Sequence, residues 1–174
     1  RYTVEVSTLM ETTPNKALRR TILEITNAGG APHIGSAFSM VEILNSIFTT
    51  MDIKKIRAHA PDRDRFVMSK GHGASALYAV MHAHGLMSDA DIATFHKNGS
   101  LLAGHASHFV RFVEHSTGAL GHGLSVGLGM ALGLRSGGGN ARVFVLVGDG
   151  ELNEGSNWEA LMLAGHLKLW NLTL

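Results

Sequence analysis

The 174-residue sequence contains no cysteine, so disulfide scaffolds, thiolate metal sites and cysteine nucleophiles are all excluded. Charged residues make up only 17%, against about 25% in average soluble domains, which indicates a chain that exposes less surface to water than usual. Either a subunit interface or a missing remainder of the protein explains this shortage. The 15 Lys and Arg nearly balance the 14 Asp and Glu, and a net charge of +1 provides no basic field for nucleic acid or anionic lipid.

Long apolar runs are absent as well. No uninterrupted run reaches the length of a membrane span, about 18 residues, and no basic segment followed by an apolar one opens the chain. We therefore expect no membrane span and no secretory signal. Because the first residue is Arg1 rather than Met, we also expect a piece of the N-terminus to be missing.

The spacing of apolar residues predicts an α/β fold. Helices are expected at about 14–29, 40–51, 74–84, 88–99, 124–134 and 156–167, and strands at 66–68, 142–147 and 171–174. Ser39 with Glu42 predicts a capping box, and Ser88 is expected to cap the helix that follows it. The strand at 142–147 shows no alternation, which is typical of a strand buried on both faces of a parallel sheet. With the helix and strand that follow, it predicts a βαβ unit.

Two stretches resist this assignment. Residues 54–65 are polar and irregular, a stretch that could conceal missing residues. Residues 101–123 are rich in Gly and His and have no convincing periodicity, and a loop of this length inside a compact domain is usually functional. In the helix that follows, Gly123, Gly127 and Gly129 are expected to let another backbone come close.

The strongest local signal is Gly148-Asp149-Gly150, at the carboxyl end of the clearest strand. Ligands of open parallel sheets bind beyond the carboxyl ends of the strands. A carboxylate between two glycines suits a hard divalent cation that bridges to phosphate oxygens, and glycine amides can meet the same oxygens. A tight turn with a capping Asp explains the tripeptide equally well.

Histidine supplies the second signal, because four of the 11 histidines fall in glycine-containing loops: His33, His72, His105 and His122. Both protonation states of imidazole are accessible near pH 7, which suits proton transfer and oxyanion stabilisation. A structural metal is disfavoured, since no His-Glu-x-x-His motif occurs. The other histidines are expected to be surface or satisfied interior groups: His59, His82, His84, His96, His108, His115 and His166.

Acidic residues give a third signal. Glu154 and Glu159 fall at the start of the helix after Gly-Asp-Gly, where the helix dipole favours negative charge. Glu154 is explained equally well as an ordinary N-terminal helix charge. Serine nucleophile elbows and the common dinucleotide and triphosphate loops are absent from the sequence.

Five blocks in order resemble the N-terminal, diphosphate-binding part of the transketolase family, most closely the split kind whose halves are separate chains. The blocks are Pro-His33-Ile-Gly-Ser, Ser-Lys-Gly-His72-Gly, Gly-His105, Ser116-Thr-Gly-Ala-Leu-Gly-His-Gly and Gly-Asp149-Gly-Glu-Leu-Asn-Glu154-Gly. The resemblance implies a three-layer, doubly wound parallel sheet with helices on both faces, incomplete at its C-terminus. Residues 1–174 would then form a truncated diphosphate-binding domain, and the pyrimidine-binding domain would lie outside this chain.

The resemblance also implies thiamine diphosphate held through a divalent cation, usually Mg2+, with Ca2+ or Mn2+ as substitutes. Asp149 would be the first cation ligand. His72, Gly148 and Gly150 would meet the diphosphate, and Gly118 and Leu120 the aminopyrimidine. His33 and His105 would face the substrate, while Glu154 and Glu159 would join the acidic network across the dimer.

The implied activity is transfer of a two-carbon ketol unit from a ketose to an aldose, with sugars or sugar phosphates as substrates. The partner implied is a C-terminal, pyrimidine-binding subunit in a heterotetramer, and the chain alone should be inactive. A cytoplasmic location is expected from the missing signals and from sugar metabolism. The family's second cation ligand, an Asn, is expected about five residues beyond Leu174.

Two departures concern Ala119 and His122, where many full-length members have Pro and Gln. They favour the split subgroup and weaken inference about the usual sugar phosphates. The alternatives are a deoxyxylulose phosphate synthase type, a 2-oxo acid dehydrogenase E1 type and a catalytically silent subunit. Donor and acceptor sugars remain open, as does whether the partner half is a separate chain.

Overall fold

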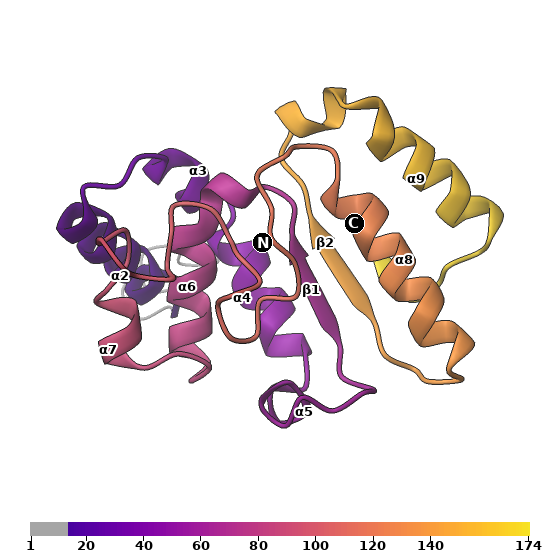
Figure 1. Ribbon diagram of the computed structural model, residues 1–174, viewed down its shortest axis with the longest axis horizontal. Coiled ribbons are helices and arrows are strands. Elements are labelled where there is room, and N and C mark those ends of the chain that lie inside the picture. The colour runs from indigo at the N-terminus through magenta and orange to yellow at the C-terminus, as the bar shows by residue number, and fades with distance from the viewer. Residues whose placement is uncertain (1–13) are drawn as a thin grey trace, which may run out of the picture.

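A parallel sheet of three strands runs through the middle of the molecule, with helices on both of its faces (Figure 1). This computed structural model describes residues 14–174. The strands are β1 (Arg65–Met68), β2 (Val143–Leu146) and β3 (Leu172–Thr173), in the order β1-β2-β3. The register pairs Phe66 with Phe144 and Val143 with Leu172. The α/β class and the parallel sheet predicted from the sequence are confirmed.

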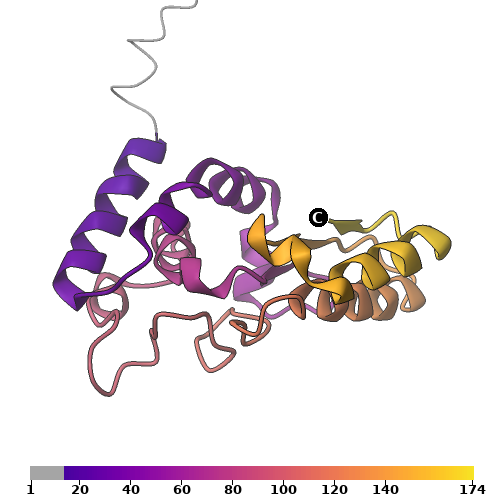
Figure 2. The ribbon, with the colours of Figure 1, turned by 90° about the horizontal axis from the view of Figure 1, so that it is seen from above.

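The helices fall into two groups, one on each face of the sheet. One group contains α2 (Pro14–Gly29), α3 (Ile34–Phe38), α4 (Val41–Thr50) and α6 (Ala74–Ala83), and the other contains α8 (Gly123–Ser136) and α9 (Gly155–His166). Figure 2 shows α8 and α9 side by side on the same side of the sheet. Short elements complete the chain: α5 (Ile53–Arg57), α7 (Asp89–Ile92), and the 3-10 turns η1 (Gly71–Gly73) and η2 (Gly150–Asn153).

Alternation along the strands separates the two cores. Phe66 and Phe144 pack with the core of α2, α4 and α6, whereas Val67, Val143 and Val145 pack with α8 and α9. Both sets are buried because a parallel strand between two helical layers has no solvent face. Helix α6 packs against both α2 and α4, and all eight of its residues from Ala74 to Met81 are buried. The three-layer arrangement that the resemblance implied is therefore confirmed.

Several local predictions were wrong. Residues 54–65 are not wholly irregular, because Asp52 accepts hydrogen bonds from the amides of Lys54 and Lys55 and caps α5. Residues 34–38, for which no helix was predicted, form the short helix α3. The capping box at Ser39 and Glu42 does not form, and Met40 is the N-cap of α4.

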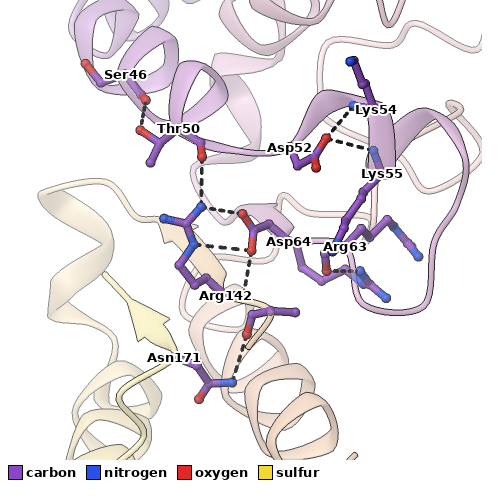
Figure 3. A network of polar contacts seen from close by, with 11 residues as sticks. Ser46, Thr50, Asp52, Lys54, Lys55, Arg63, Asp64, Arg142 and Asn171 are labelled. Atoms are coloured by element: carbon purple, nitrogen blue, oxygen red, sulfur yellow. Dashed lines mark hydrogen bonds and ion pairs between the residues drawn. The ribbon is translucent and has the colours of Figure 1, made fainter. Parts of the chain in front are cut away.

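The amino ends of β1 and β2 are joined by an ion pair (Figure 3). The Arg142 guanidinium lies 2.6 Å from the Asp64 carboxylate, which also accepts the Arg142 amide at 2.8 Å. The guanidinium donates to the Thr50 carbonyl at 2.9 Å, which adds the end of α4. The hydrogen bond to Asp64 raises the pKa of Arg142. Nearby, Glu114 of the long loop pairs with Arg63 at 2.9 Å.

Within residues 14–174, no helix combines the length and apolar character needed to cross a membrane.

Candidate active site

The loops that follow β1 and β2 meet at one edge of the sheet, because parallel strands present their carboxyl ends together. The chain leaves β1 through Ser69 and Lys70 into η1, and it leaves β2 through Gly148 and Asp149 into η2. A Cβ atom built at Gly148 would lie 3.4 Å from Cδ of Lys70, so the two loops are in contact.

Three of the four histidines singled out in the sequence come together. The ring centroids of His33 and His72 are 5.3 Å apart, and those of His33 and His105 are 6.4 Å apart. Burial lowers the pKa of His72, and the neighbouring His33, Lys70 and His105 lower it further. His72 is therefore held as a neutral imidazole at neutral pH.

His33 reaches this cluster with a strained backbone. Its φ of 74° and ψ of 25° lie in the left-handed region, where a residue with a Cβ is disfavoured. Strain of this kind persists only where surrounding structure imposes it, and it gathers at functional sites. The fourth histidine, His122, is exposed at the start of α8, and its Nδ1 lies 3.1 Å from the Leu120 carbonyl oxygen.

The loop 101–122 packs closely against η1. A Cβ at Gly71 would lie 2.8 Å from the carbonyl carbon of Thr117 and 2.9 Å from the amide nitrogen of Gly118. Gly118 itself has a φ of 136°, and a Cβ there would lie 3.0 Å from Cδ2 of His105. Glycine at these positions lets the histidine loops and the backbone near Leu120 approach one another.

Asp149 is exposed and makes no capping hydrogen bond to η2. The alternative of a capping Asp in a tight turn is therefore wrong, and the carboxylate is directed to solvent at the sheet edge. Gly150 leaves open space beside it. Among residues 14–174, no three His, Asp or Glu side chains lie close enough together to hold a metal ion.

The two acidic residues predicted to lie at the start of the next helix, Glu154 and Glu159, occupy different positions relative to the site. Glu154 is the exposed N-cap residue of α9, and its Cβ lies 2.6 Å from the position that a Cβ at Gly121 would take. Ser156 donates to the Gly121 carbonyl at 2.7 Å, so the start of α9 holds the long loop. Glu159 is exposed farther along the helix and is not brought to the histidine cluster by any contact within residues 14–174.

One buried acidic residue at the meeting point of these loops was missed in the sequence. Glu151 is only 2% exposed, and its carboxylate accepts hydrogen bonds from the Ser69 hydroxyl, the Gly121 amide (2.9 Å) and the Gly148 amide (3.0 Å). No signal in the sequence separates it from Glu154, since both are acidic residues after Gly-Asp-Gly.

The histidines and the Asp149 carboxylate lie beyond the carboxyl ends of the parallel strands. This is where open α/β sheets bind their ligands, so the chain is a ligand-binding α/β domain. The family model described as "Transketolase, thiamine diphosphate binding domain" matches residues 11–174. The chain belongs to this transketolase family, as its five sequence blocks predicted.

Individual proteins agree with the family match. The chain is 40% identical over 162 residues to a protein of Actinobacillus succinogenes that is named as one subunit of an apulose-4-phosphate transketolase, a match that covers 91% of this chain and 59% of the relative. It is 41% identical over 157 residues to the transketolase of Mus musculus, covering 89% of this chain and 25% of that protein. The solved transketolase of Leishmania mexicana superimposes with a TM-score of 0.78 at 34% identity, over 92% of this chain and 26% of that one. The chain thus spans just over half, or a quarter, of the relatives that it matches.

Proposed function

We propose that this chain is the diphosphate-binding part of a thiamine diphosphate-dependent transketolase, which moves a two-carbon ketol unit from a ketose to an aldose. The observation that carries the proposal is the convergence of His33, His72 and His105 beside the loop of Asp149, in a chain of this family. Three separate segments supply these groups, and close glycine contacts join the segments of His72 and His105.

The residues present fit the cofactor. A diphosphate needs backbone that it can approach closely, and Gly150 has no atom within 4 Å of the position a Cβ would take. His72 and Gly150 would hold the diphosphate, and Asp149 would hold the divalent cation, Mg2+ or a substitute such as Ca2+ or Mn2+. Gly148 would lie beside the diphosphate without donating its amide, which already donates to Glu151.

The aminopyrimidine would lie against the backbone of Gly118 and Leu120, both of which are exposed. Thiamine diphosphate, when bound, supplies a thiazolium carbanion that accepts the two-carbon unit from the donor carbonyl. His33 and His105 are exposed, and their imidazole rings lie beside each other in the histidine cluster. They are suited to forming hydrogen bonds with substrate hydroxyls and to transferring protons to and from them. His72, whose pKa is lowered by burial, would donate an N–H to the diphosphate.

A partner with a pyrimidine-binding domain is part of the proposal. Two relatives are named as single subunits of an apulose-4-phosphate transketolase, and the chain covers only 59% and 55% of them. Helix α9 exposes Trp158, Met162 and Leu163, an apolar surface larger than a solvated helix normally presents. We place residues 1–174 in a heterotetramer of two such chains and two partner chains, in the cytoplasm. Glu154 and Glu159, on or beside α9, would belong to the acidic network across that assembly.

The decisive experiment compares two histidine variants of the same loop in the full-length protein with its partner. His105→Ala should lower kcat/KM for ketol transfer by about a hundredfold or more. His108→Ala removes an exposed imidazole bonded to Ser116 and should leave transfer within about twofold. Transfer should require thiamine diphosphate and should stop when EDTA removes the divalent cation.

Other outcomes would contradict the proposal. Unchanged transfer by His105→Ala would remove the histidine cluster from the reaction. Release of carbon dioxide from a 2-oxo acid donor would identify a synthase or a decarboxylating dehydrogenase instead. Failure of the assembled protein to bind thiamine diphosphate with Mg2+ would identify a catalytically silent protein.

A further inference from the structure

Glu151 is a buried carboxylate at the centre of the loops that surround the proposed site. Its Oε1 accepts hydrogen bonds from the Ser69 hydroxyl and, at 2.9 Å, from the Gly121 amide. Its Oε2 accepts the Gly148 amide at 3.0 Å. The three donors come from the end of β1, the end of the long loop and the end of β2, so one side chain joins all three segments.

The carboxylate of Glu151 takes part in none of the ion pairs within residues 14–174, so no cationic side chain of that range neutralises it. Burying a charge is costly, and three charge-assisted hydrogen bonds are what offset the cost here. A buried charge contributes little to overall stability. The role of Glu151 is therefore to be found in the segments that its carboxylate joins.

Further hydrogen bonds hold the backbone of Glu151 and the hydroxyl of Ser69 in place. Asn157, which is fully buried, donates to the Glu151 carbonyl at 2.7 Å and fixes the backbone of η2. Ser69 accepts the Gly123 amide at 3.1 Å while its hydroxyl points to Glu151. The carboxylate is therefore placed by α9 and linked to the first residue of α8.

Each segment that Glu151 joins carries residues assigned to the cofactor. Gly121 follows Gly118 and Leu120, Gly148 precedes Asp149, and the segment after Ser69 leads to His72. The three loops have to be spaced so that one meets the aminopyrimidine, one the cation and one the diphosphate of the same bound cofactor. A shift of any one loop would misplace it relative to the other two.

We propose that Glu151 is a positioning residue of the thiamine diphosphate site, whose carboxylate holds the three cofactor-facing loops at their working distances without touching the cofactor itself. This inference rests on the proposed function. It assigns to Glu151 an effect on cofactor affinity, since preorganised loops reduce the cost of ordering the site on binding.

The test uses Glu151→Gln in the full-length protein with its partner. The amide NH2 of Gln would face a backbone N–H, so at least one of the three hydrogen bonds becomes a donor–donor contact. The matched control is Glu114→Gln, the same change in a partly buried Glu of the long loop that pairs with Arg63 at the opposite end of the sheet. Ser69→Ala is the milder second variant, which removes one donor and leaves both amides in place, and it decides the matter if Glu151→Gln does not fold.

Two readouts separate positioning from general destabilisation. Without cofactor, amide hydrogen exchange at Gly121 and Gly148 should be faster in Glu151→Gln and unchanged in Glu114→Gln. With Mg2+, the Kd and the KM for thiamine diphosphate should rise about tenfold or more in Glu151→Gln and about threefold in Ser69→Ala, while kcat at saturating cofactor stays within about twofold. The control should change neither constant.

The inference is overturned if Glu151→Gln binds the cofactor as tightly as the wild type, if kcat falls with an unchanged Kd, or if exchange at both glycine amides is unaltered. In each of these cases the wild type still binds thiamine diphosphate, and the proposed function stands. A wild-type protein that does not bind thiamine diphosphate with Mg2+ overturns both, which distinguishes the two failures.

Discussion

Glycine-to-alanine substitutions in α8 should have different effects at positions two residues apart. Gly127 lies against the sheet, and a Cβ there would come 2.3 Å from Cγ2 of Val145. Gly129 is exposed, with nothing within 4 Å of the same position. One substitution therefore fills space that is already occupied, and the other fills open solvent.

The magnitudes follow from two opposing effects. Replacing a helical glycine by alanine favours the helix by about 1 kcal/mol, and both variants gain this amount. At Gly127, overpacking costs about 1–3 kcal/mol, because Val145 is β-branched, buried in the central strand and cannot move aside. Gly129→Ala should thus raise the free energy of unfolding by about 1 kcal/mol. Gly127→Ala should lie about 1–3 kcal/mol below it.

Equilibrium unfolding in guanidinium chloride measures both variants, and Gly133→Ala serves as a second open position in the same helix. The packing argument is refuted if Gly127→Ala proves as stable as Gly129→Ala. It is also refuted if both open positions lose stability on substitution.

Three further perturbations have defined outcomes. His33→Gly relieves the left-handed backbone and should raise the free energy of unfolding by about 0.5–1 kcal/mol while abolishing transfer, whereas His33→Ala, measured in the same denaturation assay, should give no such gain. Asp64→Ala leaves the Arg142 amide and guanidinium without their acceptor and should cost about 1–3 kcal/mol in chemical denaturation; an unchanged midpoint would contradict this. Burial lowers the pKa of His72 and His84, so the unfolded chain binds more protons than the folded one once the pH drops below about 6.5. The stability that these two residues contribute should be complete well above that pH and decline as the pH falls from about 7 to about 5. If the slope of stability against pH is as steep in His84→Gln as in the wild type, His84 is excluded as a cause.

The long helices and the strands were predictable because each has a burial pattern that the sequence displays. The stripe Leu18, Ile22 and Ile25 gives α2 its buried face, and the unbroken apolar run of β2 reflects helices on both sides. Helices α3 and α5 contain five residues each, too few for a repeating pattern. Gly129 was predicted to make a close contact together with Gly123 and Gly127. It points outward instead, because it is only two residues from Gly127 and therefore lies on another face of the helix.

Two serine motifs show why local signals fail. Ser88 and Asp91 form the reciprocal capping box, although the helix ends at Ile92 rather than near Gly99. Ser39 and Glu42 have the same spacing, but the Glu42 carboxylate pairs with Arg19 at 2.6 Å. The Glu42 carboxylate binds a partner 23 residues away along the chain instead of the backbone at the start of its own helix, and no short motif identifies such a partner.

The acidic residues of the site show the limit most clearly. Sequence reasoning chose Glu154 because the helix dipole favours it, and the structure leaves Glu154 exposed while it buries Glu151. Which of two nearby acids is buried depends on the donors that three distant loops deliver to one point. The meeting of His33, His72 and His105 came from the family resemblance, since their separation along the chain contains no information about distance in space.

The ion pair between Asp64 and Arg142 sits at the end of the sheet opposite Asp149 and the histidine loops. The ion pair that ties the strands together and the proposed site therefore lie at opposite ends of the same strands. Laboratory evolution for heat tolerance would act at the amino ends of the strands, around the Asp64–Arg142 pair. Under the proposed function, selection for new acceptor sugars would act at the carboxyl ends of the same strands.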